Sequence, residues 1–149
     1  MDNNKYYTPE IEEFKVGFEY EMNDELISQS LTKRTPVQWH KCVFWHSYED
    51  VLETRSMLEH YIEFNDVRVK YLDIIDIEEL GFKEEWSDLA FWKYRKDNCF
   101  IKNDLDTPPY DNVYEIWVEP YEGQSNKMYH GQILNKSELI FILKRLGVL

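Results

Sequence analysis

The sequence predicts an α+β fold: a single domain with a predominantly antiparallel sheet. Its 149 residues are the size of one ordinary domain. Several short segments alternate apolar and polar residues, which is typical of half-buried strands. Two segments, about 48–63 and 136–146, instead repeat apolar residues at helical spacing and predict the two main helices. We expect about five to six strands within residues 6–149, after a disordered leader at 1–5.

The first expected strand covers residues 13–22. Its even-numbered positions are all apolar or aromatic: Phe14, Val16, Phe18, Tyr20 and Met22. Successive side chains of a strand point to opposite faces, so this set should face the core. Glu13, Glu19 and Glu21 should then stand on the solvent face of the strand.

The middle of the chain predicts a strand, a helix and a second strand. Residues 23–36 lose the alternation and should form a loop, after which the alternation resumes in 37–45. The helix at 48–63 follows. Residues 67–72 alternate again, and one or two helical turns closed by Gly81 should come next.

The second half predicts four strands and the final helix. Short strands are expected at 89–95 and 98–101, followed by a hairpin of strands 112–120 and 128–134 around the turn residues 122–126.

The clearest helix is the last one. Asn135 should act as its N-cap, with Glu138 at the third helical position, and Gly147 should end it.

The charge distribution limits the kinds of partner. The net charge is −12, which argues against binding nucleic acid through phosphates, because that affinity comes from clustered Lys and Arg. Residues 1–26 and 73–88 each carry a net charge of −6. Residues 127–149 carry four basic residues against one acidic residue, so the negative field should be uneven.

The expected compartment is the cytoplasm. No apolar run is long enough to span a membrane, and the acidic start lacks the features of a secretory signal. Two isolated cysteines, Cys42 and Cys99, fit a reducing compartment better than a disulfide framework, so we expect free thiols.

Three blocks resemble a family of small uncharacterised proteins encoded by bacteriophages and prophages. The blocks are YYTPEIEEFKVGFEYE, VRVKYLDIIDIEELGF and GQILNKSELIFILKRLGV, which together cover about a third of the chain. The resemblance implies a phage-derived accessory protein acting in the bacterial host cytoplasm. No catalytic residue is carried over from it.

No common catalytic motif is present. The sequence lacks GxxxxGK[ST], GxGxxG, GxSxG, HExxH and CxxC, so we expect no catalytic residue, no metal and no cofactor. His40, Cys42 and His46 share one strand face as soft metal ligands could, with His60, His130 and Cys99 as further ligand candidates. However, Cys42 and His46 would be about 13 Å apart on a continuous strand, so ordinary sheet-face residues are the simpler interpretation. A Cys42–His40 nucleophile dyad would lack an orienting third group.

Two acidic segments could hold a hard cation. The carboxylates of residues 73–79 could bind magnesium, although a solvated acidic turn explains them as well. Asn103, Asp104 and Asp106 resemble a calcium loop that lacks its glycine and its terminal glutamate.

The function predicted from these observations is partner binding. We expect a non-enzymatic, anti-CRISPR-like protein that binds the basic surface of a host nucleic-acid-handling factor, possibly a CRISPR nuclease, and inhibits it. The alternatives are a phage structural or assembly accessory protein and a small metal-dependent enzyme. The expected partner-binding residues are Glu13, Glu19, Glu21, Asp73, Asp76, Glu78, Glu79, Trp86 and Trp92. Their competing interpretation is a solvated sheet face, with the tryptophans in the core.

Overall fold

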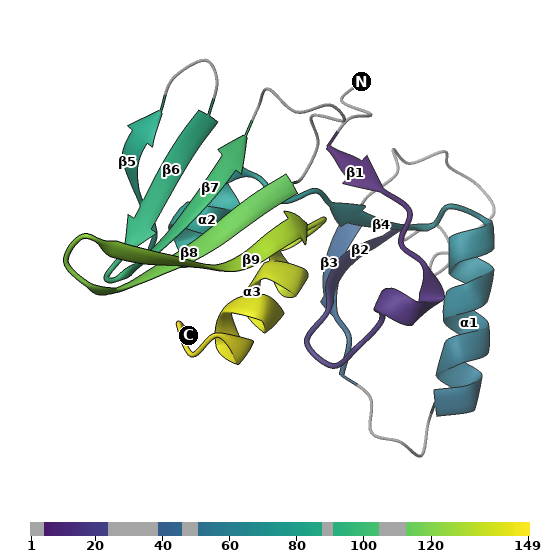
Figure 1. The fold of residues 1–149 in the computed structure, drawn as a ribbon. Coiled ribbons are helices and arrows are strands. Elements are labelled where there is room, and N and C mark those ends of the chain that lie inside the picture. Colours follow the sequence, from purple (N-terminus) through teal and green to yellow (C-terminus); the bar gives the residue numbers. More distant parts are fainter. Residues whose placement is uncertain (1–4, 24–38, 46–50, 88–90, 105–112) are drawn as a thin grey trace. The chain divides into compact units, whose positions relative to one another are not determined.

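The structure is a computed structural model. It describes residues 5–23, 39–45, 51–87, 91–104 and 113–149, and Figure 1 shows the fold. The chain divides into two compact units, residues 1–71 and 72–149.

The α+β class is confirmed, but the expectation of one sheet is wrong. The described strands number nine rather than five to six, and they form two antiparallel sheets, one of four strands and one of five. Alternation in a sequence shows which face a strand buries but not which strands lie beside it, so it could not show this division. The expectation of one domain stays a prediction.

The first unit is built around its four-stranded sheet. Its elements are β1 (Tyr6–Tyr7), the 3-10 helix η1 (Ile11–Glu13), β2 (Glu19–Asn23), β3 (Trp39–Val43), α1 (Val51–Glu63) and β4 (Val67–Lys70). The strand order is β1-β4-β2-β3. The predicted helix and the third predicted strand are therefore confirmed as α1 and β4. Residues 24–38 and 46–50, which include parts of the predicted loop, strand and helix, lie outside the described residues.

The predicted strand 13–22 is wrong in its first half. Glu13 ends η1, and Gly17 has a φ of +89°, a turn conformation that interrupts an extended chain. Because of this interruption, the alternation does not continue through the segment. Val16 is 66% exposed, whereas Phe18 is buried. Only β2 retains the expected strand geometry.

The second unit is an antiparallel meander with two helices. Its elements are α2 (Ile74–Glu79), β5 (Lys83–Ser87), β6 (Phe91–Lys96), β7 (Cys99–Asp104), β8 (Val113–Tyr121), β9 (Gln124–Gln132) and α3 (Lys136–Arg145). The strand order β5-β6-β7-β8-β9 follows the sequence. The predicted hairpin is confirmed as β8 and β9, and its turn is shorter than expected because Gly123 adopts a φ of +80°. Sequence reasoning did not find β5.

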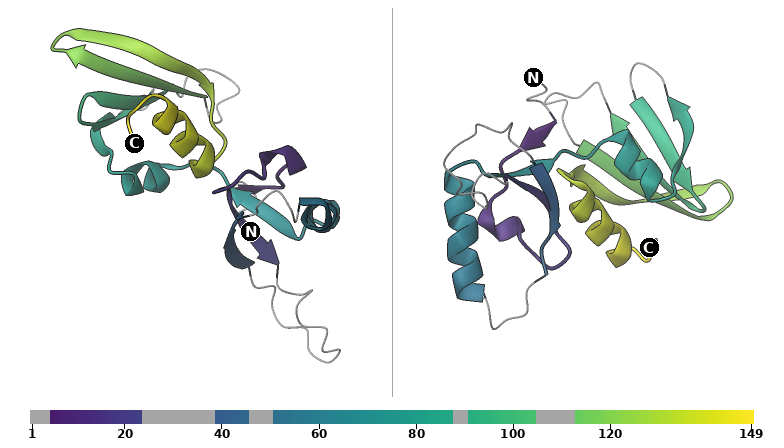
Figure 2. Two further views of the ribbon diagram at one scale, coloured as in Figure 1. Left: turned by 90° about the horizontal axis from the view of Figure 1, so that it is seen from below. Right: turned by 180° about the vertical axis from the view of Figure 1, so that it is seen from behind.

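The core of this unit lies on one face of the sheet. Tyr94, Ile101, Ile116 and Tyr129 are direct cross-strand neighbours on β6 to β9. Ile77 of α2 and the α3 residues Leu139 and Leu143 belong to the same buried cluster. Both helices therefore cover the same side of the sheet (Figure 2, left).

Helix α3 begins as the sequence predicts. The Asn135 side chain accepts a hydrogen bond from the Glu138 backbone N–H at 2.9 Å. The Glu138 carboxylate in turn accepts one from the Leu134 backbone N–H at 2.7 Å. The first contact satisfies a donor that the start of a helix leaves free, and the second ties the first turn of the helix to the residue before the cap.

Replacing Ile116 by alanine should destabilise the protein by about 2–5 kcal/mol, because the residue is fully buried and its loss leaves a cavity. Urea unfolding measures the change. The control is Ile75→Ala at a position that is 59% exposed, where we expect a change of about 0.5 kcal/mol or less. Equal losses in the two variants would contradict this placement of the core.

Candidate functional site

The predicted acidic residues of the first unit have different environments. Glu19 is exposed. The Glu13 carboxylate accepts hydrogen bonds from the Tyr7 hydroxyl at 2.6 Å and from the Glu10 backbone N–H at 2.8 Å. One Glu21 oxygen pairs with both Nε and Nη2 of Arg68 at 2.8 and 2.7 Å. Glu13 and Glu21 therefore hold local structure, which the sequence pattern could not show.

The Arg68 guanidinium also contacts two aromatic rings. It lies 3.8 Å from the centre of the Tyr6 ring and 4.0 Å from that of Trp39. Cation–π contact with both rings adds to the ion pair with Glu21. Charge reversal at Glu21 would therefore disturb this cluster as well as change the surface charge.

The acidic residues of α2 also divide into structural and exposed groups. Asp73 is the N-cap: its side chain accepts a hydrogen bond from the Asp76 N–H at 3.1 Å. The Asp76 side chain accepts one from the Asp73 N–H at 3.2 Å, and Asp76 is only 8% exposed. Glu78 and Glu79 are exposed, and Glu79 forms an ion pair with Lys136 at 2.6 Å. The reciprocal cap explains why acidic residues begin this helix.

Two apolar side chains of α2 lie beside these carboxylates in the sequence and remain exposed. Ile74 is 40% exposed and Ile75 is 59% exposed. Exposed apolar side chains that lie together and are rimmed by polar residues are a feature of interaction surfaces. We call Ile74, Ile75, Glu78 and Glu79 the α2 surface.

The two candidate tryptophans lie on opposite faces of the five-stranded sheet. Trp92 packs against the core cluster. Trp86 is the cross-strand neighbour of Lys93, which stands on the other face, and it is 45% exposed. Only Trp86 can act as an exposed anchor.

The metal and nucleophile candidates gain no support from the geometry. No cluster of three potential ligands occurs within the described residues, and His46 and Asp106 lie outside them. Both cysteines are free. Burial raises the pKa of the Cys99 thiol to about 11 and also raises the pKa of Cys42. Thiols with raised pKa values stay protonated at neutral pH and are poor nucleophiles.

A cationic and aromatic surface covers the other side of the five-stranded sheet. Strand residues that alternate with the core row of Tyr94, Ile101, Ile116 and Tyr129 have their side chains on this side of the sheet, which we call the outer face. In the described part of residues 72–149, no helix or strand packs on it (Figures 1 and 2). It carries five cations, from four strands: Lys83, Lys93, Arg95, Lys102 and Lys127.

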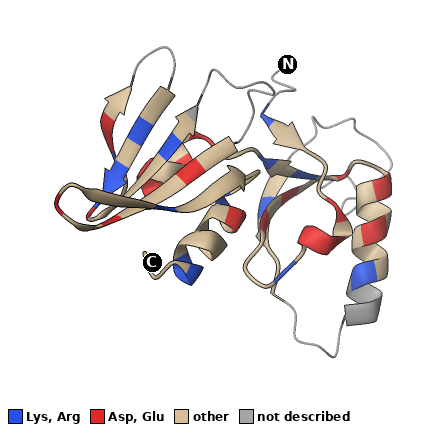
Figure 3. Ribbon diagram, viewed as in Figure 1, with Lys and Arg blue, Asp and Glu red and all other residues tan. Residues whose placement is uncertain are grey.

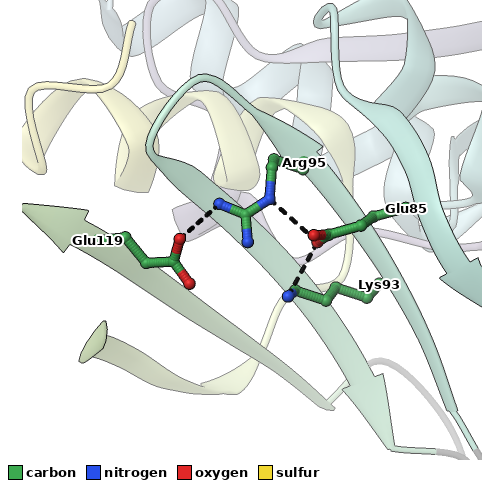
Figure 4. Close-up of polar contacts among 4 residues, drawn as sticks. All are labelled: Glu85, Lys93, Arg95 and Glu119. Carbon is green, nitrogen blue, oxygen red and sulfur yellow. Dashed lines mark hydrogen bonds and ion pairs between the residues drawn. The ribbon is translucent and has the colours of Figure 1, made fainter. Parts of the chain in front are cut away.

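Three glutamates on the outer face neutralise part of this charge. Arg95 contacts Glu119 at 2.8 Å and Glu85 at 3.0 Å, and Lys93 contacts Glu85 at 2.9 Å (Figure 4). Glu115 pairs with Lys127. Hydrogen bonds from Lys93 and Arg95 hold the pKa of Glu85 below its usual 4.5, and the hydrogen bond from Arg95 lowers the pKa of Glu119.

The aromatic rings of the outer face lie under its cations. The Phe100 ring has the Lys93 ammonium 4.1 Å from its centre, and the Phe91 ring has that of Lys102 at 4.6 Å. Lys127 lies 5.0 Å from the Trp117 ring. The Trp86 and Phe91 rings are in tilted contact, with 4.3 Å between their centres and 48° between their planes.

Irregularities interrupt both edges of this sheet. The pairing of β5 with β6 shifts between Glu84 and Trp86, so Glu85 is an extra residue and its side chain reaches Lys93 and Arg95. The pairing of β8 with β9 shifts at Met128. Bulges of this kind discourage edge pairing, so the faces of the sheet are the more suitable surfaces for a partner.

Sequence reasoning did not find the outer face. The available signal was the common parity of Phe91, Lys93 and Arg95 in one predicted strand and of Phe100 and Lys102 in the next. The cations are spread over residues 83–127, and only the sheet brings them together (Figure 3).

No known protein family, curated protein or solved structure matches the chain. None of the described helices has both the length and the apolar composition needed to cross a membrane. The resemblance to phage proteins stays a prediction.

Replacing Glu85 by glutamine should lower stability at pH 7 by about 0.5–1 kcal/mol, since the carboxylate is partly exposed. Because the folded state holds the pKa of Glu85 below 4.5, the unfolded chain takes up this proton first as the pH falls. The stabilisation is therefore fully present above pH 4.5. It is lost as the pH falls through the lower pKa that Glu85 has in the folded state.

Urea unfolding of both proteins at pH 7 and pH 3 measures this effect. The difference between wild type and Glu85→Gln should shrink at pH 3. A difference that stays constant over this range would show that the Glu85 carboxylate does not stabilise the folded state through its charge.

Proposed function

We propose that this chain is a non-enzymatic binding protein whose α2 surface contacts a basic, nucleic-acid-handling protein in the cytoplasm of a bacterial host and inhibits it. A host defence factor such as a CRISPR nuclease fits this description. The observation that carries the proposal is the exposure of Ile74 and Ile75 beside Glu78 and Glu79 on one short helix.

The two kinds of side chain have different roles in binding. Burying exposed isoleucines against a partner removes apolar surface from water. This contributes a favourable free energy of about 25 cal/mol for each Å² buried, before the costs of association. Carboxylates supply complementarity to lysine and arginine, which mainly speeds association and rejects partners of the wrong charge. Proteins that bind nucleic acid present basic surfaces, so a surface that is acidic and apolar is chemically matched to them.

The hydrogen bonds of the acidic caps hold the helix that carries the α2 surface. The reciprocal hydrogen bonds of Asp73 and Asp76 fix the first turn of α2, and the Gly81 turn at φ +88° follows the helix. A rigid, capped helix loses little conformational freedom on binding. The buried acid Asp76 thus supports the surface without being part of its contact area.

The competing functions have weaker support. A nucleophilic enzyme would need an activated thiol or a similar group, whereas both cysteines have raised pKa values. A role in phage assembly would place the protein in purified virions. No feature of the described residues favours that role over inhibition.

Replacing Ile75 by aspartate should abolish capture of the partner, and replacing Glu78 by lysine should weaken it about ten-fold by adding like charge. The measurement is an affinity pulldown of the tagged protein from its bacterial host, followed by quantitative mass spectrometry at low and high salt. Wild type should retain a nucleic-acid-handling protein.

Two controls make this experiment decisive. Glu122→Lys changes the same charge in the exposed β8–β9 turn and should retain the partner. Urea unfolding of Ile75→Asp and Ile75→Ala, compared with wild type, checks that a loss of capture does not come from unfolding of the protein. Capture that is unaffected by Ile75→Asp and Glu78→Lys, or retention of phage structural proteins alone, would overturn the proposal. Substitutions at Glu21 and Asp76 are unsuitable, because both residues hold local structure.

A further inference from the structure

The outer face has a local charge opposite to that of the chain. Five cations share this face with three glutamates and with Asp104, which is in register with Phe91, while the whole chain has a net charge of −12. Figure 3 shows the basic bands of β6 and β7 side by side. We propose that the outer face binds single-stranded nucleic acid. This inference is independent of the proposed function, since it concerns a different surface of the same unit.

The cations occupy positions that cost stability. Lys83 is the direct cross-strand neighbour of Arg95, and Lys93 is that of Lys102. Like charges directly opposite each other in a sheet are destabilising. Glu85 and Glu119 contact Lys93 and Arg95, and Glu115 is the other cross-strand neighbour of Lys102, so three carboxylates offset part of the repulsion among these cations. An arrangement that opposes stability at two adjacent places is typical of a functional surface.

Two of these cations are available to an anion. Lys93, Arg95 and Lys127 all form ion pairs with glutamates. Within the described part of the chain, Lys83 and Lys102 form no such pair. The Lys102 ammonium lies over the Phe91 ring and can contact a phosphate without breaking an ion pair.

An exposed ring stands beside these lysines. Trp86 is the cross-strand neighbour of Lys93, contacts the Phe91 ring at a tilt of 48° and leaves 45% of its surface exposed. Phe91 in turn carries the Lys102 ammonium. A flat aromatic surface next to an ammonium group that forms no ion pair matches a nucleotide, in which a base and a phosphate are similarly close.

Single strands fit this chemistry better than the other polyanions. The stacking faces of bases are accessible in single strands and occluded in a duplex. An acidic peptide could use the lysines, but it would not use the indole plane. The overall negative charge lowers the affinity without preventing contact, because distant carboxylates are screened beyond about 10 Å at 0.1 M salt.

The test uses fluorescence anisotropy with a labelled 15-nucleotide oligo-dT and the full chain at several salt concentrations. Lys83→Gln and Lys102→Gln together should weaken binding at least ten-fold. They should also make the slope of log K against log salt shallower, by about 0.7 for each phosphate that the protein no longer neutralises. Trp86→Ala should weaken binding by about five-fold or more, because the base can no longer stack on the indole ring.

The control is Lys144→Gln, compared with Lys102→Gln alone so that each variant loses one charge; it removes an exposed positive charge from α3, the helix packed on the core face. Its affinity should equal that of wild type. Folding is checked by urea unfolding, in which Lys102→Gln should change the equilibrium constant for unfolding by about two-fold or less, about 0.5 kcal/mol, because Lys102 lies between the like-charged Lys93 and the oppositely charged Glu115.

Three results would overturn the inference. The first is the absence of binding to oligo-dT at low salt. The second is equal or tighter binding of a duplex, or of polyglutamate in a manner that depends on Lys102. The third is an equal loss of affinity in Lys144→Gln, which would show that only the total charge matters.

Discussion

One-sided burial of the five-stranded sheet determines most of what the second unit presents to its surroundings. Tyr94, Ile101, Ile116 and Tyr129 form a row across four strands, and α2 and α3 cover the core face that carries this row. Because side chains alternate along a strand, burying this row forces the intervening residues onto the other face. The outer face is therefore the geometric consequence of the core, and its chemistry is set by residues that the core does not use.

Most of the charged side chains among these intervening residues contact an aromatic ring or an oppositely charged side chain on the same face. Cations lie over aromatic rings, and Glu85, Glu115 and Glu119 link strands through ion pairs. Each surface contact of this kind contributes little by itself. Together they explain how a strongly acidic chain can keep several cations on one sheet, since each glutamate offsets repulsion between cations that alternation alone would place together.

The sequence was sufficient to predict an element where the pattern that defines it lies within a few neighbouring residues. The caps, the apolar spacing of α3 and the turn of the β8–β9 hairpin all lie within a few residues, so the elements could be predicted. The prediction was wrong at residues 13–18, because the conformation of Gly17 depends on a turn that alternation does not reveal. The division into two sheets and the gathering of distant lysines depend on strand order, which no local pattern encodes.

The sequence also could not distinguish the roles of the candidate acidic residues. Glutamate and aspartate have the same charge whether they contact a partner or cap a helix, and only the fold separates the two roles. Asp73 and Asp76 cap α2 and Glu21 pairs with Arg68, whereas Glu78 remains exposed. The second unit thus carries an acidic, apolar helix surface and a cationic, aromatic sheet face. Rising salt weakens binding at either surface. Salt sensitivity of a complex therefore cannot identify the surface in use, and the sign of the substituted charge has to do so.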